Sequence, residues 1–406
     1  MKMLLYISWR NIWRHPARSG VLIGAIISGL WAGILISSWA NGLVEQRVNR
    51  VIQEELTHLQ IHHPNFLTER EPGMFIESFE QIYATLERDQ RVKSFTARTL
   101  VDGMVQSPLT TSGVQIKGIM SDRERETTNF HENLVQGEYI DADVRNPVVI
   151  GRTLAEKLNV EIGNRIVLAF QDINNELISG AFNITGMFHT GQAMYDETAV
   201  FVRSEDLYLL LSDQPLFHEI AVMLKEDEDS EAVVADLNSQ FENIIAETWL
   251  EISPEMRYMT QAGGTYMFYI MLVIMFALAF GILNTMLMAI FERMHELGML
   301  MAIGMSKSRI FWMIILESLI LTLTGAAAGM LLGHMSVEYL RKNGLDLTAV
   351  GGDSFELWGY DARVYPYVTP EEYISVTILV IVTAMLAAIY PAIKALRLTP
   401  GEVVKE

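Results

Sequence analysis

Four long apolar runs stand out along the chain, at about 20–40, 266–290, 310–333 and 373–393. Each is long enough to cross the hydrocarbon core of a bilayer as a helix, which takes about 20 residues. The second run carries no charged residue, and the third carries only Glu317. Buried helices of soluble proteins are rarely so long and so free of charge, so the pattern predicts four transmembrane helices.

The segment between the first two runs has different patterns. Residues 41–56 repeat apolar positions at intervals of three and four, as in a helix that prolongs the first span. Runs that predict strands follow, separated by glycine- and asparagine-rich turns: HLQIHH, VKSFTARTLVDGMVQ, SGVQIKGIM, NPVVIG, NRIVLAF, AFNITGMF, TAVFV and HEIAVML. Helical patterns alternate with these strands at 77–88, 152–159, 204–212 and 229–246. We therefore expect an α+β domain here, with residues 254–266 returning as a second helical stalk.

Charge is distributed unevenly and sets the expected topology. The whole chain has a net charge of −19, and residues 41–264 alone hold 17 basic and 37 acidic residues. Residues 2–18 carry four basic residues and no acid. The positive-inside rule then places both termini and the 291–309 loop in the cytoplasm, and the 41–264 and 334–372 loops outside. A signal peptide is the competing interpretation of the first run, but that run is longer than a signal peptide's apolar region.

The predicted fold is thus an α-helical membrane protein with four transmembrane helices and an α+β extracytoplasmic domain inserted between helices 1 and 2. Residues 1–40 would hold the N-terminus and helix 1. Residues 41–264 would form the extracytoplasmic domain with its stalks. Residues 265–406 would hold helices 2–4 and a cytoplasmic tail.

Several kinds of chemistry are absent from the sequence. The chain has no cysteine, which excludes disulfides, thiolate catalysis and cysteine-ligated metal. The acidic balance argues against nucleic acid as a partner. No Walker A loop, zincin helix or nucleophile elbow is found, so we expect no catalytic residue. His58, His62 and His63 lack a convergent fourth ligand, so we also expect no metal site.

Small residues mark two of the predicted spans. The first contains Gly24, Gly29 and Gly33, and the third contains Gly325, Gly329 and Gly333 at intervals of four. Such spacing lets helix backbones approach closely in lipid. We expect close helix packing at these positions, and spans one and three to line a seam between two subunits.

Glu317 is the charged residue inside the third span. An intramembrane carboxylate is costly and usually faces a protein interior or a cavity. No partner for it is evident among the residues of the spans. It is therefore interpreted either as a hydrogen-bonding group in helix packing or as a functional group.

Between the second and third spans lies a short amphipathic segment, 291–310, interrupted by Gly298 and Gly304. Leu297, Leu300, Met301 and Ile303 supply an apolar face. Such a helix fits a groove on a cytosolic partner, or it lies on the lipid surface. Periodicity alone does not separate these two interpretations.

Four motifs, in order, resemble those of one transporter family. FERMHELGMLMAIGMSKSRIFWMIILESLILTLTGAAAGMLLG (291–333) resembles the signature of FtsX-like ABC-transporter permeases. The tail YPAIKALRLTPGEVVKE (390–406) and the entry SWRNIWRHPARSG (8–20) are similar to the ends of the same family. VVIGRTLAEKLNVEIGNRIVL (148–168) resembles an element of its MacB-like and lipoprotein-releasing (Lol) branch.

The resemblance implies a permease subunit in the bacterial inner membrane, with the large loop in the periplasm. It would pair with a second permease, as a homodimer or heterodimer, and with a cytosolic ABC ATPase dimer that binds ATP and Mg²⁺; we expect no cofactor in this chain. The coupling helix would be 291–305, and ATP-driven motion would reach the periplasm by mechanotransmission. The motif residues there are Glu292, Arg293, Glu296, Leu297, Gly298, Ala302 and Gly304.

Among the branches of the family, the architecture is similar to the lipoprotein-releasing permeases, which pass lipoproteins to a periplasmic chaperone. An acyl-chain cavity would be lined by adaptable apolar side chains, and the candidates are Met267, Phe268, Met271 and Met275. Ordinary lipid-facing surface is the alternative interpretation of these residues.

One departure from the lipoprotein-releasing pattern concerns residues 169–186. One subunit type of that branch has a long hairpin there that hooks the chaperone, whereas this segment is short and lacks proline. The difference favours the partner subunit without a hook or a MacB-like exporter. The alternatives for function are therefore efflux of a peptide or small molecule with a periplasmic adaptor, or FtsX-like mechanical transduction to cell-wall hydrolases.

Overall fold

The computed structural model describes Tyr6, residues 8–10, Arg14 and residues 16–140, 144–212, 214–348 and 363–396. Within these, the chain divides into two compact units. A helical unit contains residues up to Val44, Thr260–Asp346 and the chain from Arg363 onward. A sheet unit contains Glu45–Met259 and Leu347–Ala362. The end of the predicted tail motif, 397–406, lies outside the described residues.

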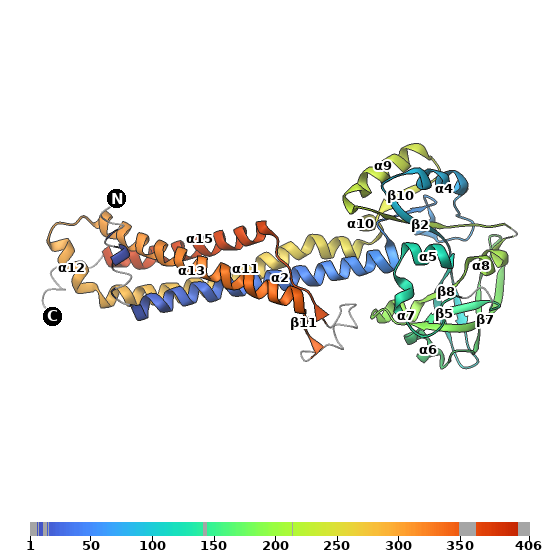
Figure 1. Ribbon diagram of the computed structural model, residues 1–406, viewed down its shortest axis with the longest axis horizontal. Helices are drawn as coiled ribbons and strands as arrows, with labels where there is room; N and C mark the ends of the chain where they lie inside the picture. Colours follow the sequence, from blue (N-terminus) through green and yellow to red (C-terminus); the bar gives the residue numbers. More distant parts are fainter. Residues whose placement is uncertain are drawn as a thin grey trace. The chain divides into compact units, whose positions relative to one another are not determined.

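Long helices build the helical unit (Figure 1). They are α2 (Pro16–Val51), α11 (Pro254–Glu292), α13 (Lys307–Asn343) and α15 (Pro370–Leu396), with the short α12 (Met294–Ala302) between α11 and α13. The four long helices have the length and apolar composition needed to cross a membrane. Each contains one of the apolar runs seen in the sequence. A small β-hairpin of β11 (Leu345–Asp346) and β12 (Arg363–Val364) follows α13.

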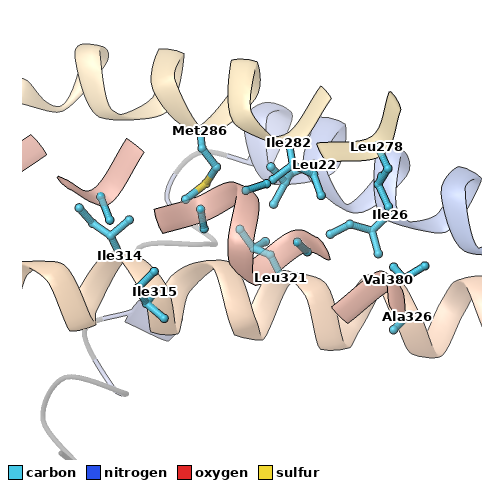
Figure 2. Packing of buried hydrophobic residues seen from close by; sticks show 14 of the residues in the cluster. Leu22, Ile26, Leu278, Ile282, Met286, Ile314, Ile315, Leu321, Ala326 and Val380 are labelled. Atoms are coloured by element: carbon cyan, nitrogen blue, oxygen red, sulfur yellow. The ribbon is translucent and has the colours of Figure 1, made fainter. Parts of the chain in front are cut away.

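The apolar faces of the four long helices meet in one core. Figure 2 shows Leu22 and Ile26 of α2 facing side chains from the other three helices. Leu278, Ile282 and Met286 come from α11, Ile314, Leu321 and Ala326 from α13, and Val380 from α15. In the most apolar 18-residue stretch of α13, half of the stretch is buried. This share is larger than in the corresponding stretch of α2, α11 or α15. The third span is therefore the central helix of the unit.

The sheet unit is built on ten strands. They are β1 (Leu59–His62), β2 (Val92–Gln106), β3 (Thr111–Ile119), β4 (Leu134–Gly137), β5 (Pro147–Gly151), β6 (Arg165–Gln171), β7 (Leu177–Phe188), β8 (Ala199–Arg203), β9 (Glu219–Leu224) and β10 (Ile245–Thr248). Their order is β10-β1-β9-β2-β3-β8-β5-β7-β4, and β6 pairs with both β2 and β7. Most pairs are antiparallel, whereas β3 with β8 and β5 with β7 are parallel.

Helices cover the sheet and divide its core into parts. They are α3 (Phe66–Glu69), α4 (Phe79–Arg88), α5 (Ser121–Thr127), α6 (Arg152–Leu158), α7 (Ala193–Thr198), α8 (Ser204–Leu211), α9 (Ser230–Gln240) and α10 (Trp249–Ile252). One core lies among β1, β9, β10, α4 and α9, and another among β5–β8, α6 and α8. The long strand β2 enters both, with Phe95 in the first and Val101 and Val105 in the second. This strand therefore joins the two halves of the unit.

The eight predicted strands are all present, and two further ones were missed. The helix predicted over 229–246 is wrong at its end, because α9 stops at Gln240 and β10 follows. The Asn238 side chain bonds both backbone groups of Ala246, which turns the chain back and lets β10 pair with β1. The short strand β4 pairs only with β7 among the described strands and is mostly exposed, so its sequence carries little apolar signal.

Both stalk segments are helical. Helix α2 continues to Val51 and then widens into one π-helical turn, η1 (Ile52–Leu56). Helix α11 begins at Pro254 and runs into the second apolar run without a break. Proline is well placed there because the first turn of a helix needs no backbone donor.

Candidate functional site

The short helix α12 lies between two sharp changes of chain direction. Helix α11 ends at Glu292, and Arg293 leaves the helical conformation with φ −103° and ψ 15°. After Ala302 the chain turns at Gly304, whose φ of +100° suits glycine because it has no Cβ. Helix α13 then begins at Lys307. The segment is therefore a helix held at both ends rather than a flexible loop.

The residues of this segment fall on two faces. Leu297 is 2% exposed and packs into the core of the helical unit, and Gly298 is buried beside it. Glu292, Met299, Ala302 and Ile303 are exposed, with Ile303 at 85%. One face thus anchors α12 to the long helices, and the other presents apolar side chains outward.

Arg293 lies between two carboxylates. Its Nη1 donates to both oxygens of Glu317, at 2.9 and 3.1 Å, and its Nε donates to Glu296 Oε2 at 3.3 Å. The Arg293 and Glu317 side chains are only 13% and 15% exposed. No partner was expected among the residues of the spans, and Arg293 lies outside them, in the segment between the second and third spans. The partner lies 24 residues earlier, and only the fold of α12 against α13 brings the two side chains together.

A small cavity of about 40 Å³ adjoins this ion pair. Its polar lining is Ser19, Thr285, Arg293 and Glu317, and its apolar lining includes Leu297. Four elements, α2, α11, α12 and α13, therefore meet around one buried charge pair.

The glycines of α13 are covered by α2 of the same chain. A Cβ added at Gly325 would lie 2.9 Å from Ile26 Cγ2, one at Gly329 would lie 3.2 Å from Ile27 Cα, and one at Gly333 would lie 2.8 Å from Ile34 Cδ1. These distances are too short for a larger residue to fit without a shift. The α13 glycines therefore serve helix packing within the chain.

The glycines of α2 differ from one another. Gly29 faces Leu278 of α11, and Gly33 faces Val376 of α15 and Met271 of α11. Around Gly24 no other atom of the described chain lies within 4 Å of an added Cβ. Whether these positions line a seam between two subunits stays a prediction.

An apolar groove of about 370 Å³ runs between α11 and α15. Phe268 and Met275, two of the candidate cavity residues, line it. Met271 instead packs inward against Gly33, and Met267 is not part of the lining. The other residues around the groove are Leu272, Phe276, Ala279, Leu379, Thr383, Leu386 and Ala387. The sequence analysis named no residue of α15 for this lining, because the sequence does not indicate which face of that helix lies next to α11.

The sheet unit contains a buried charge network beneath the π-helical turn. Arg98 of β2 donates to Glu124 at 2.6 Å, to Glu219 at 2.7 Å and to the Glu55 carbonyl at 3.0 Å. The side chains of Arg98, Glu124 and Glu219 are 2%, 1% and 8% exposed. His62 adds a contact of 3.1 Å to Glu219. The end of the first stalk is therefore bonded directly to the central strand of the sheet.

Replacing Arg98 should strongly destabilise the sheet unit. Arg98→Met would leave two buried carboxylates without their cation, which typically costs about 3–5 kcal/mol. The loss in free energy of unfolding is measured by urea unfolding of the full-length protein in detergent. The unfolded fraction at each urea concentration is monitored by proteolysis of the sheet unit. The matched control is Arg152→Met, because its pair with Glu156 is mostly exposed and should change stability by less than about 1 kcal/mol. Equal losses in both variants would contradict the role of Arg98.

The same network predicts a pH dependence. Burial by itself would raise the pKa of Glu219, but Arg98 and His62 outweigh it and lower that pKa from 4.5 to about 2. The unfolded chain therefore binds the proton more readily, so this contribution to stability is present above about pH 4.5 and lost as the pH falls towards 2. The wild type should lose more stability over that range than Arg98→Met.

The three histidines considered for a metal site do not converge. His62 pairs with Glu219 in the core, whereas His58 Nδ1 accepts the Leu224 backbone N–H. His63 Nδ1 accepts the backbone N–H of Asn65 at an exposed position. Among the described residues, no cluster of three or more metal-ligating side chains occurs.

Strands β6 and β7 are joined by a short turn. Asp172 Oδ1 accepts the backbone N–H groups of Asn174 and Glu176, each at 2.8 Å. Asn175 takes a positive φ of 62°, which asparagine tolerates better than most residues. The strands pair fully up to this turn, from Gln171 with Leu177 onward. No long hairpin projects from the chain at this place.

Comparison with known proteins matches two family models to the chain. A model of the FtsX-like permease C-terminal domain matches residues 268–400, and a model of the MacB-like periplasmic core domain matches residues 19–240. The second match by itself covers more than half of the chain.

Individual relatives are distant in sequence. The lipoprotein-releasing system transmembrane protein LolE of Haemophilus influenzae is 20% identical over 99% of both chains. LolC of Neisseria meningitidis is 22% identical over 54% of this chain, and the match spans 56% of that protein. The macrolide export ATP-binding/permease protein MacB of Escherichia coli is 26% identical over 30% of this chain and 20% of its own length.

Proposed function

We infer the function of this chain from its family: it belongs to the FtsX-like permeases with a MacB-like periplasmic core domain, and is therefore a permease subunit of an ABC transporter. Family members work with cytosolic ABC ATPases. We propose that this chain lies in the bacterial inner membrane, with its sheet unit in the periplasm. It would act with a second permease subunit and an ATPase dimer.

The exposed face of α12 is the proposed docking site for the ATPase. Met299 and Ile303 are exposed although they are apolar, and the charged Glu292 at the end of α11 is exposed as well. An amphipathic helix with apolar anchors and charged edges suits a groove on a partner protein. The buried face of α12, with Leu297, would pass motion from that partner to the long helices.

We propose that the transported substrate is an acylated lipoprotein, released from the inner membrane towards the outer membrane. The observation that carries this proposal is the groove between α11 and α15, whose lining is apolar except for Thr383. Phenylalanine, methionine and leucine side chains of this kind adapt to flexible acyl chains. The full-length similarity to LolE, which is named as part of a lipoprotein-releasing system, supports the same substrate class.

A second candidate is efflux of a peptide or small molecule with a periplasmic adaptor. The short β6–β7 turn favours it, since a long chaperone-hooking hairpin is missing at that place. The same turn also suits the lipoprotein-releasing partner subunit without a hook. An FtsX-like transducer would need neither a groove nor a substrate.

Filling the groove should block substrate binding. Thr383→Trp places an indole among the lining residues, whereas Val382→Trp, one residue earlier, lies outside the lining and is the matched control. Purification in mild detergent followed by mass spectrometry should show acylated proteins with the wild type and the control. The groove variant should retain less than about a tenth of the acylated proteins. A tenfold lower affinity corresponds to a loss of about 1.4 kcal/mol in binding free energy.

Each other outcome of this purification points elsewhere. A bound ATPase together with a periplasmic adaptor and no acylated protein would favour efflux. Equal recovery of acylated proteins from both variants would reject the groove as their site.

A further inference from the structure

The ion pair of Arg293 and Glu317 joins two separate elements of the helical unit. Arg293 is the residue at which the chain leaves α11 and enters α12. Glu317 lies on α13 ten residues after its start, about 15 Å along the helix. The pair therefore links the start of α12 to the interior of the central helix.

The surroundings make this link a strong constraint. Leu22, Met286, Met313 and Leu321 lie around the same cavity as the two charges, so little water can compensate them. In such a setting, removing one partner leaves an uncompensated buried charge. The Arg293 guanidinium also holds Glu296 of α12, so its planar fork bridges two helices and not just one residue pair.

We propose that Arg293 is a positioning residue that locks α12 to α13, so that a load on α12 moves the third span. Arg293 would not touch the ATPase or the substrate; it would transmit motion between them. The inference rests on the proposed function, because α12 must receive its load from an ATPase. Leu297 supplies an apolar contact in the same place, but an apolar contact can slide, whereas the bridged ion pair fixes both distance and direction.

A double substitution separates positioning from stability. Arg293→Gln should destabilise the protein because the buried Glu317 carboxylate loses its cation. Glu317→Gln should destabilise it less, because Arg293 keeps its bond to Glu296. The double variant removes both charges and should recover most of that stability, as paired removal often does. A merely structural role predicts that transmission recovers with stability, whereas the proposed role predicts that transmission stays lost.

The absence of cysteine gives a clean measurement of transmission. Tyr339→Cys places a single fluorescent label on the exposed far part of α13. The labelled chain is purified with the ABC ATPase that binds it, and the label is read before and after addition of ATP and vanadate. The wild type should show a nucleotide-dependent change in fluorescence. The three variants should bind the ATPase, but their fluorescence change should be at least about fivefold smaller.

The matched control is Arg152→Gln with Glu156→Gln, an exposed pair in the sheet unit, which should behave as the wild type. A wild-type response in the double Arg293→Gln, Glu317→Gln variant would overturn the proposal. Failure of the wild type to bind any ATPase would instead overturn the proposed function, so the two failures are distinguishable.

Discussion

Charge placed on the exposed face of α12 should release the ATPase. In the double variant Met299→Glu, Ile303→Glu, two apolar anchors become carboxylates in an interface centre, where a well-placed side chain is typically worth about 2 kcal/mol or more. We expect ATPase binding to weaken by roughly 30-fold or more, with the permease still folded because both side chains are exposed. Binding of the purified ATPase to the immobilised permease measures the effect.

Two further variants make this result specific. Gly298→Pro should also abolish binding, because proline inside α12 removes a backbone donor and breaks the helix. Met335→Glu, an exposed methionine of α13 beyond the predicted 310–333 span, should keep binding. Wild-type affinity in both α12 variants would reject α12 as the coupling helix.

Enlarging a glycine of α13 should separate α13 from α2. A Cβ at Gly329 would already lie 3.2 Å from the Ile27 backbone, and a leucine side chain adds three more carbons. Overpacking of this kind typically costs about 1–3 kcal/mol. Gly329→Leu should therefore lower the temperature at which the detergent-solubilised protein aggregates, measured as the fraction that stays monodisperse after heating.

Gly24→Leu is the matched control on the facing helix, because an added Cβ there meets no described atom within 4 Å. It should leave the thermal stability of the single chain unchanged. If Gly24→Leu separates a dimer into single chains, the predicted seam between subunits gains direct support. If Gly329→Leu has the thermal stability of the wild type, α2 does not pack against α13 at this glycine.

The sequence by itself determined most of the elements of this protein, with β4, β10 and the end of α9 as the exceptions. Long apolar runs can satisfy their backbone groups in lipid as helices, so the four long helices follow from composition and length. Alternating and β-branched runs likewise predicted eight strands. Gly304 was part of a recognised motif, and its positive φ explains why a glycine stands there. These features depend on local patterns, which a sequence shows directly.

Only the tertiary structure decided which elements meet. It gave Glu317 its partner Arg293, placed α15 beside α11 to form a groove, and set the α13 glycines against α2. It also placed Arg98 between Glu124 and Glu219, which are 26 and 121 residues away. Such contacts depend on how helices and strands pack, and packing is chosen by the fit of whole surfaces. Periodicity along one element does not contain that information, because it gives the buried face and not the neighbour that covers it.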